Sequence, residues 1–546
     1  VVSNLPEKRW TDGAWLGWHK RSNHFARPIN IYEVHASSWK QHEDGSLYTL
    51  RDLQKELIPY VKEQGFNYIE FMPLTAHPLD ASWGYQTTGY FALERAYGEP
   101  RDLQDFVEAC HKENIGVLAD WVPGHFCINS DALAYYDGTP CYEFEEGWRA
   151  QNKGWGALNF DLGKPQVQSF LLSSALFWLE YYHLDGLRVD AVSNMLYRDY
   201  DRGPGEWKPD QYGGNRNIEG IEFLHKFNKT IKEMHPERIL IAEESSSQVK
   251  ITGRIEDGGL GFDYKWNMGW MNDFTEYMKY DPVYRGAHHD QLTFSMVYAY
   301  SEKFMLSLSH DEVVHLKGSM YTKMPGTPEQ KMANLRLAYA YQMVHPGKKL
   351  LFMGQEFGQE KEWNEKQPLS WELLEDKEHL QLKNYMAALH AFYKANPALY
   401  QLDEKPEGFE WINGMEWEKN LLIFLRRTRK KEDTLLVICN FSNVEYDDFR
   451  IGVPYPGKYK EMFNSDAESY GGTGVGNPRV KMSKKTECDE RKNSITVKLA
   501  PLSVQVFSYT KPETGAASNK RAKAKTAAKA ATEKKTGKNV KSAGKP

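Results

Sequence analysis

Charged side chains occur within or directly after four short apolar stretches that are predicted to be buried strands. In DGLRVDAV (185–192), Leu187 and Val189 point to one face of the strand, whereas Arg188 and Asp190 point to the other. Buried charges are costly unless they are paired or used, so four such stretches indicate one shared active site. The other three contain Asp120 and His125, Glu243 and Glu244, and His310 and Asp311.

These residue types suit the cleavage of a glycosidic bond. That reaction passes through an oxocarbenium-like state, and it needs one carboxylate as nucleophile or stabiliser and one carboxylic acid as proton donor. Arg188 is expected to keep Asp190 ionised, because an opposite charge on the same face favours the charged form. Glu243 stands beside other carboxylates, so we expect a raised pKa and a role as the acid. By strand alternation, Glu244 is expected to face away from the site.

The same residue types also serve as ligands of metal ions. The His-x-His pair that metallohydrolase barrels carry on their first strand is absent, since His35 stands alone there. The sequence also lacks a glycine-rich phosphate loop. Both observations disfavour metal catalysis and phosphate chemistry.

Eight apolar, β-rich runs alternate with longer amphipathic stretches, and they must position these residues. This alternation predicts a parallel (β/α)8 barrel, which places its active site at the C-terminal ends of the strands. Residues 126–160, rich in Gly, Tyr and Trp, are expected to form an inserted loop between the third and fourth strands. The runs are 28–36, 66–74, 115–125, 185–192, 238–245, 261–268, 303–312 and 349–358.

The 546 residues are too many for one compact core. Residues 1–27 form a polar, Trp-rich N-terminal segment, and 28–400 carry the barrel pattern. Residues 401–510 contain strands and turns without helices, which predicts an all-β sandwich domain. The tail, 511–546, holds ten Lys and one Arg against two Glu, and it has almost no large apolar residue. We therefore predict that the tail is disordered.

Composition limits the location and the partners of the chain. The five cysteines are scattered without metal-ligand spacing, which fits reduced thiols and a cytoplasmic protein. No apolar run approaches the roughly 18 residues that span a bilayer, and the first residues do not form a secretory signal, so no membrane partner is expected. The basic tail could contact a polyanion, but composition alone carries little specificity and a nucleic-acid partner is not expected.

Several motifs resemble the signature regions of the α-amylase family of barrel enzymes over about residues 5–510. They are YEVHASSW, WGYQTTGYFA, ADWVPGHF, NFDLG, DGLRVDAV, AEES, GFDYKWNMGW, SHDE and GQEFGQ, with YGGTGVGN in the β domain. The resemblance implies a retaining enzyme that cuts an α-1,4-glucan such as glycogen or amylose through a covalent glycosyl-enzyme. AEES together with WGYQTTGY favours members that then pass the chain to a 6-hydroxyl.

The resemblance also implies roles for single residues. Asp190 is the nucleophile, Glu243 the general acid/base, and Asp311 a third carboxylate that binds sugar hydroxyls. Arg188 holds Asp190 in place. Neither a metal ion nor an organic cofactor is implied. The subsite for the ring being cut is lined by Tyr85, Asp120, His125 and His310. Candidates for stacking against the acceptor sugar are Trp83, Tyr85, Trp121 and Trp363.

The sequence departs from the family pattern in three places. Leu316 follows SHDEVVH where the family usually has Gly, which puts the shape of that loop in question. The usual N-terminal carbohydrate-binding module is expected to be absent, and the basic tail is not part of the pattern. Two alternatives stay open. One is a hydrolase of the same family, amylase-like or trehalose-releasing. The other is an inactive sugar-binding barrel, which the three intact carboxylates disfavour.

Overall fold

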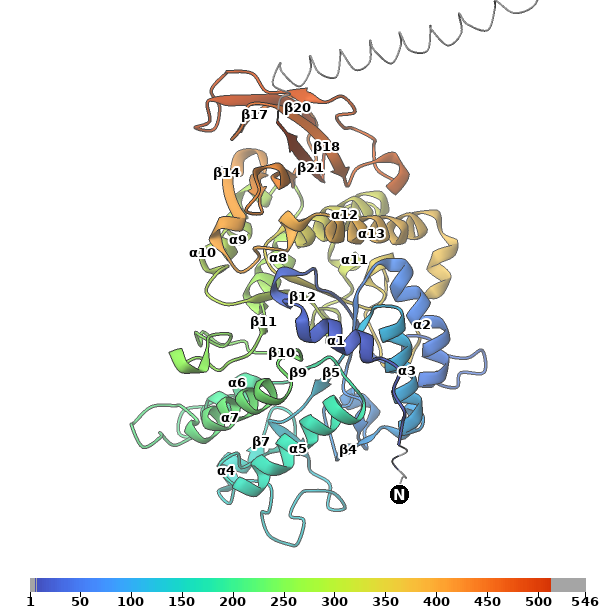
Figure 1. Cartoon of the computed structure of the whole chain (residues 1–546), viewed down its shortest axis with the longest axis vertical. Helices are drawn as coiled ribbons and strands as arrows, with labels where there is room; N and C mark the ends of the chain where they lie inside the picture. Colours follow the sequence, from blue (N-terminus) through green and yellow to red (C-terminus); the bar gives the residue numbers. More distant parts are fainter. Residues whose placement is uncertain (1–4, 6, 512–546) are drawn as a thin grey trace, which may run out of the picture.

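Eight parallel strands close into a barrel at the centre of the molecule (Figure 1). The computed structural model describes residue 5 and residues 7–511, so the predicted disorder of the tail falls almost wholly outside the described residues. Each of the eight predicted runs overlaps one barrel strand, which confirms the (β/α)8 prediction. The strands are β1 (Asn30–Val34), β2 (Tyr68–Phe71), β5 (Gly116–Trp121), β9 (Gly186–Val189), β10 (Ile239–Ala242), β11 (Tyr264–Trp266), β12 (Phe304–Leu308) and β13 (Lys348–Phe352).

Amphipathic helices surround the barrel because each buries one apolar stripe against the strands. In α2 (Leu50–Gln64), Leu50, Leu53, Leu57 and Val61 recur at helical spacing and are all buried. A capping box between Thr49 and Asp52 starts this helix, and Gly65 ends it in the left-handed region at φ 81°. The other helices predicted between strands are α3 (Pro100–Lys112), α5 (Pro165–Tyr181), α7 (Ile218–Met234) and α12 (Pro328–Val344).

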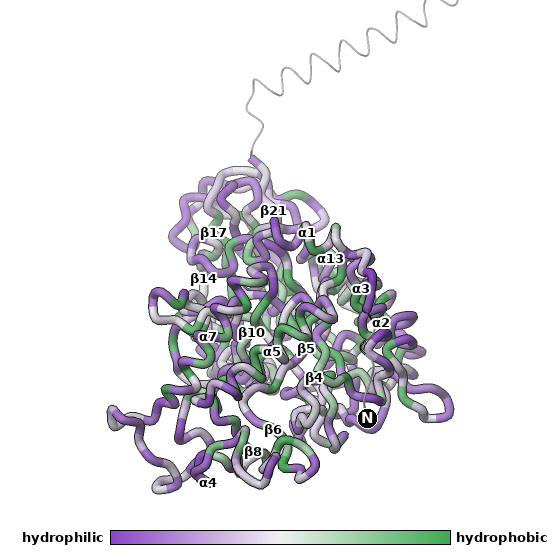
Figure 2. The backbone as a smooth tube through the Cα atoms, turned by 60° about the horizontal axis from the view of Figure 1, so that its bottom comes forward, coloured by the Kyte–Doolittle hydropathy of each residue, from purple (hydrophilic) through white to green (hydrophobic). Residues whose placement is uncertain are grey.

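Of the described helices with more than five residues, three were not predicted from the sequence. They are α1 (Gly13–Arg21), α8 (Met268–Lys279) and α13 (Lys377–Ala395). Hydrophobic segments gather near β5 and β10 in the middle of the molecule, whereas the outer loops near α4 are mostly hydrophilic (Figure 2). Among the described helices, none is long and apolar enough to cross a membrane.

The predicted insertion between the third and fourth barrel strands folds into a small lobe. Its β6 (His125–Cys127), β8 (Ala157–Asn159) and β7 (Gln151–Asn152) form a three-stranded sheet, with α4 (Gly147–Ala150) beside it. Figure 1 shows α4 and β7 at the end of the molecule opposite the C-terminal domain. This lobe therefore extends the barrel wall near the C-terminal end of β5.

The C-terminal domain is a β-sandwich, as predicted. Its inner apolar layer includes Ile423, Ile438, Ile451 and Val497, which join the two sheets. The six-stranded sheet also packs against α12 and α13 of the barrel. Its strands, in spatial order, are β14 (Phe409–Glu416), β15 (Leu421–Arg426), β16 (Leu435–Asn440), β21 (Ser503–Thr510), β18 (Lys458–Asn464) and β19 (Lys481–Met482). The facing sheet is β17 (Tyr446–Val453) with β20 (Asn493–Leu499).

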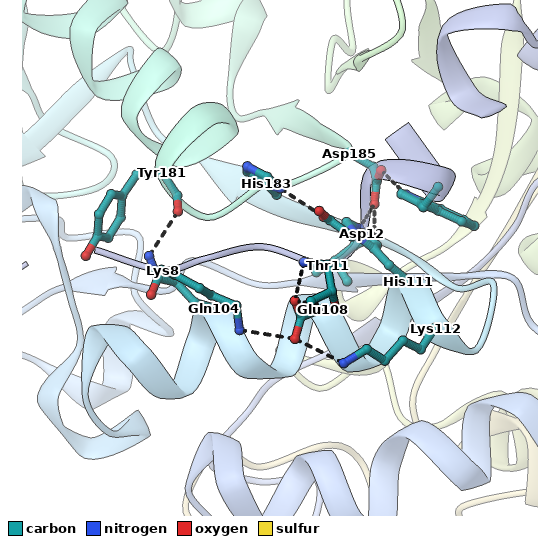
Figure 3. A network of polar contacts seen from close by, with 12 residues as sticks. Lys8, Thr11, Asp12, Gln104, Glu108, His111, Lys112, Tyr181, His183 and Asp185 are labelled. Atoms are coloured by element: carbon teal, nitrogen blue, oxygen red, sulfur yellow. Dashed lines mark hydrogen bonds and ion pairs between the residues drawn. The ribbon is translucent and has the colours of Figure 1, made fainter. Parts of the chain in front are cut away.

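A buried polar network fixes the N-terminal segment beneath the barrel (Figure 3). The His111 ring lies between two carboxylates, with Nδ1 2.9 Å from Asp12 and Nε2 3.0 Å from Asp185. Asp185 begins the DGLRVDAV stretch, and it also accepts hydrogen bonds from the Trp15 indole (2.8 Å) and the Val117 backbone (2.7 Å). This network ties α1 to the starts of β5 and β9, on the opposite side of the barrel from the strand ends that carry the predicted active site.

Candidate active site

A pocket with about 1160 Å³ of open space lies at the C-terminal ends of the barrel strands. Four segments that are distant in sequence supply its polar walls, as the strand-end argument predicted. Seven of the eight predicted site residues line this pocket. They are Tyr85, His125, Arg188, Asp190, Glu243, His310 and Asp311.

Arg188 is the central cation of the site. Its Nη1 donates to Asp190 Oδ1 at 2.8 Å and to Asp120 Oδ2 at 2.6 Å, and its Nη2 lies 3.8 Å from Glu243 Oε2. The guanidinium also lies over the Trp266 ring, 4.3 Å from the ring centre. One buried arginine thus fixes the positions of three carboxylates, which is why a strand inside the barrel carries this charge.

Glu243 is held by the backbone that follows Asp190. The Ala191 N–H donates to Glu243 Oε2 at 2.6 Å. Ala191 has φ 50°, a left-handed conformation that is unfavourable for a residue with a side chain. The fold therefore holds a strained backbone at Ala191, the residue after Asp190, whose N–H binds the Glu243 carboxylate.

His310 is oriented by a residue that the sequence analysis missed. Glu33, at the end of β1, lies 2.6 Å from His310 Nδ1 through Oε1 and accepts the His310 backbone N–H through Oε2 at 2.9 Å. Burial opposes protonation of this ring, but Asp311 and Glu33 together raise the pKa of His310 to about 9. His310 Nε2 lies 3.5 Å from Asp311 Oδ1. At neutral pH the pocket therefore contains an imidazolium beside Asp311.

Asp120 takes a different place from the one expected. It does not line the open pocket but lies beneath it, where Tyr85 donates its hydroxyl at 2.6 Å. Burial, only partly offset by Arg188, raises the pKa of Asp120 to about 7. Asp120 is only 4% exposed, and both Tyr85 and Arg188 donate to its Oδ2, so Asp120 positions these two side chains that line the pocket.

The two central carboxyl groups both titrate above their ordinary range. Burial raises the pKa of Asp190 to about 7 against the opposing effect of Arg188, and burial likewise raises the pKa of Glu243. Arg188 lowers the pKa of Asp190 as expected, but burial outweighs it, and Arg188 also interacts with Asp120 and Glu243. By contrast, His310 and Arg188 overcome burial and lower the pKa of Asp311.

Strand alternation correctly places Glu244 away from the pocket. Its carboxylate accepts hydrogen bonds from Lys265 Nζ at 2.6 Å and Ser193 Oγ at 2.7 Å. The same rule shows why Trp121 was a wrong candidate for sugar stacking. Its neighbour Asp120 faces the barrel interior, so Trp121 points outward and stacks on Phe227 in the helix layer.

Aromatic side chains flank the mouth of the pocket. Trp83 and Tyr85 line it as predicted, whereas Trp363 is buried behind Trp83 and donates to Ser38. Trp155, in the inserted lobe, was not predicted. Its ring lies 4.8 Å from the His125 ring, and the residue is 38% exposed. Only its place in a Trp-rich insertion could have pointed to it.

The loop after β12 contains the departure noted at Leu316. His315 and Leu316 both adopt positive φ, at 56° and 67°, and the Leu316 side chain is 98% exposed. Glu362 holds this loop by accepting the backbone N–H groups of Leu316 at 3.1 Å and Gly318 at 2.7 Å. The loop keeps the backbone shape that glycine would favour, and it leaves Asp311 in the pocket.

In the described part of the chain, no group of three or more His, Cys, Asp or Glu side chains is arranged to hold a metal ion. The charge of the site instead comes from buried arginine, imidazolium and carboxylates. Such an arrangement can donate a proton, attack an electron-poor carbon and stabilise positive charge on a sugar ring. A closed barrel with this constellation at its strand ends is typical of enzymes that process glycosidic bonds.

Comparison with known families agrees with this class. A family profile described as "Alpha amylase, catalytic domain" matches residues 34–141 and 152–417. A second, described as "Alpha amylase, C-terminal all-beta domain", matches residues 411–510. The chain belongs to the α-amylase family and, within it, to the 1,4-alpha-glucan branching enzymes.

Curated relatives support the narrower assignment. The chain is 67% identical to the 1,4-alpha-glucan branching enzyme GlgB of Lactobacillus acidophilus, over 87% of this chain and 74% of that protein. It is 50% identical to 1,4-alpha-glucan branching enzyme GlgB 1 of Clostridium perfringens strain 13, over 93% and 76%. The predicted resemblance to the family is thus confirmed.

Solved structures show the same fold at low identity. The α-amylase of Geobacillus thermoleovorans, in complex with acarbose, aligns with a TM-score of 0.63 at 14% identity, covering 93% of this chain and all of that one. An Anoxybacillus α-amylase aligns with the same TM-score at 16% identity, covering 90% and 100%. At such identity these structures support the fold alone.

Proposed function

We propose that the protein cleaves an α-1,4-linked glucan and transfers the released chain to a 6-hydroxyl, so that α-1,6 branches form. The observation that carries this proposal is the geometry around Arg188, which contacts Asp190 and approaches Glu243 at the ends of the adjacent strands β9 and β10. The branching-enzyme relatives favour glycogen or amylose as the glucan.

In the proposed first step, Glu243 gives its proton to the glycosidic oxygen while the Asp190 carboxylate attacks the anomeric carbon. The C–O bond to the leaving chain breaks, and that chain departs with a free 4-hydroxyl. The raised pKa of Glu243 supports a role as the proton donor. Asp311, ionised beside His310, is placed to bind hydroxyls of the same sugar ring.

In the proposed second step, the ionised Glu243 accepts the proton of an acceptor 6-hydroxyl. The oxygen of that hydroxyl attacks the anomeric carbon, and the bond to Asp190 breaks, so both carboxyls return to their starting states. Water would give hydrolysis instead. Trp83 and Trp155 at the pocket mouth offer flat surfaces that could favour a sugar acceptor over water.

An assay on amylose tests the proposal directly. The iodine absorbance is expected to fall with little gain in reducing ends, and a debranching enzyme should release chains from the product. If reducing ends rise in step with the loss of iodine colour, the protein is a hydrolase and the proposal is wrong. We also propose a cytoplasmic location, which the five unpaired cysteines support.

A further inference from the structure

A second hollow lies on the opposite side of the barrel from the active site. It is a shallow surface hollow of about 560 Å³, part of which is open to solvent. Its floor is formed by residues at the starts of β1 and β2, including Tyr68, and α1 forms one wall with Trp15, Trp18 and His19. No step of the proposed reaction uses this hollow.

The wall of the hollow is held rigidly in place. The Trp15 indole donates to Asp185 at 2.8 Å, and Asp12, directly before α1, pairs with His111 at 2.9 Å (Figure 3). Trp18, 40% exposed, lies at the opening, with the Arg27 guanidinium 4.1 Å from its ring centre. The hollow therefore offers a preorganised aromatic surface, which lowers the entropy cost of binding a flat ligand.

Polar groups in the hollow lack protein partners. Glu237 is 7% exposed and its Oε2 accepts no hydrogen bond, while the nearest cationic groups lie 3.9 Å from its Oε1. His19 is equally buried, and its ring nitrogens make no hydrogen bond to any described residue. The half-buried Arg27 guanidinium lies over the Trp18 ring and makes no hydrogen bond to another described residue. Buried groups such as the Glu237 carboxylate and the His19 ring are costly unless a ligand satisfies them.

The combination of groups selects the chemistry of the ligand. A bare anion would be repelled by the Glu237 carboxylate. A bare cation could not accept hydrogen bonds from the Arg27 guanidinium. A sugar ring satisfies both, because its hydroxyls donate and accept while its apolar face stacks on tryptophan. We propose that this hollow binds a glucosyl unit of the polymeric substrate, as a non-catalytic site that anchors the glucan. This inference rests on the proposed function for the choice of glucan.

The position of the hollow gives the anchor a specific effect. It opens beneath the barrel, so a short oligosaccharide bound there cannot also reach the catalytic pocket. A polymer can engage both, and the second contact then raises the local concentration of glucan chains. The site should therefore act on polymers and not on short chains.

Binding to polymer tests the proposal. Migration in native gels containing amylopectin would be compared for the Asp190→Asn protein alone and with Trp18→Ala, Glu237→Gln or Trp417→Ala added. Trp417 is an exposed tryptophan on the β-sandwich and serves as the matched control. Trp18→Ala and Glu237→Gln are expected to weaken retention about tenfold, the size of one lost stacking or charged contact. The control should migrate like the parent.

Two further measurements keep the test decisive. In proteins with Asp190 intact, the ratio of the rate on amylose to the rate on maltoheptaose should fall in both variants, and a crystal soaked in maltose should show sugar against Trp18. Glu237→Gln preserves side-chain shape, so it remains informative if Trp18→Ala does not fold. Normal retention of both variants, or a soaked hollow without sugar, would overturn the anchor. If the wild-type protein is retarded by the polymer but forms no α-1,6 bonds, the proposed function is wrong, whereas the proposed glucan-binding site is still supported.

Discussion

Glu33, near the end of β1, contacts His310, which follows β12, through both oxygens of its carboxylate. One carboxylate oxygen lies 2.6 Å from the ring Nδ1, and the other accepts the backbone N–H at 2.9 Å. The two strands are not neighbours, since β13 lies between them in the barrel. This pairing fixes the ring so that Nε2 faces Tyr85 and Asp311.

The pairing makes activity depend on pH through His310. Glu33 and Asp311 keep the ring protonated up to about pH 9, so the imidazolium beside Asp311 is retained at neutral pH. Glu33→Gln removes one of these charges, and the alkaline limb of kcat/KM should move down by about one pH unit. Glu33→Asp, which keeps the charge, should shift the limb less. A uniform loss at all pH values would indicate a purely structural role.

Substituting Asp190 and Glu243 one at a time should separate the roles of their carboxyl groups. Asp190→Asn is expected to lower the branching rate about a thousandfold or more, because no other group is placed to form the covalent intermediate. A variant that keeps a tenth of the wild-type rate would exclude Asp190 as the nucleophile.

Glu243→Gln should lower the rate on some substrates much more than on others. A glycosyl fluoride needs little proton donation to its leaving group, so its cleavage should be impaired much less than that of amylose. The comparison requires single-turnover rates on both substrates. Equal losses on the two would argue against Glu243 as the proton donor.

The features that could be predicted from the sequence are those that leave a local periodic pattern of apolar and polar residues. Eight strands and their polar ends were evident because alternation assigns each residue to a face, and Glu243 and Glu244 show that rule at work. Applied to Asp120 and Trp121, the same rule would have removed Trp121 from the acceptor candidates. Glu33 was missed because its partner His310 lies 277 positions later in the chain, and only the closed barrel brings the two together. Trp155 was missed because an insertion without periodicity gives no direction to its side chains.

Stability should depend on pH through His111. Its pKa is raised because the carboxylates of Asp185 and Asp12 outweigh burial, so its contribution is complete below the ordinary value of 6.5 and is lost as pH rises through the folded value. Hydrogen bonds to His111 lower the pKa of Asp12 against burial, so that contribution is present above 3.8 and is lost at lower pH. The network should therefore stabilise the fold most between these two values.

The variant His111→Asn tests this window. It leaves two buried carboxylates poorly paired, so the free energy of unfolding should drop by about 3 kcal/mol at pH 5.5 and by less at pH 9. Urea denaturation at the two pH values gives the comparison. His235→Asn, which loses a pair with the exposed Glu180 and a long 3.9 Å contact with Glu237, is the control and should cost less than about 1 kcal/mol. An equal loss at both pH values for His111→Asn would contradict the assigned protonation.

Substitutions at Leu316 should change the free energy of unfolding through the backbone preference of the new residue, and not through the packing of its side chain. Its side chain is 98% exposed and its φ is 67°, so apolar contacts contribute little. Leu316→Ile should lower the free energy of unfolding by about 1 kcal/mol, because β-branched residues avoid the left-handed region. Leu316→Gly should be neutral or slightly stabilising. A larger loss with Gly than with Ile, measured by urea denaturation, would show that the leucine side chain itself is needed.

Trp155 should influence whether sugar or water completes the reaction. Water is present at about 55 M, so transfer depends on effective molarities of the acceptor far above that value. Trp155 lines the pocket next to His125, and its backbone carbonyl accepts from the Gln86 side chain at 2.7 Å, which fixes its position at the mouth. Removing the ring in Trp155→Ala should lower the acceptor's advantage without touching the carboxyls that form the intermediate. We expect the ratio of new branches to new reducing ends on amylose to fall about tenfold, a loss of one stacking contact.

The matched control for this change is Tyr136→Ala. Tyr136 is an exposed aromatic residue of the same inserted segment, but it does not line the pocket. Its removal should leave the ratio of branches to reducing ends as in the wild type, whereas total amylose cleavage measures whether the first step is intact. If Trp155→Ala lowers cleavage and branching together, the ring acts on binding of the donor chain. A fall in branching with cleavage preserved would place Trp155 at the acceptor, because only the second step distinguishes a sugar hydroxyl from water.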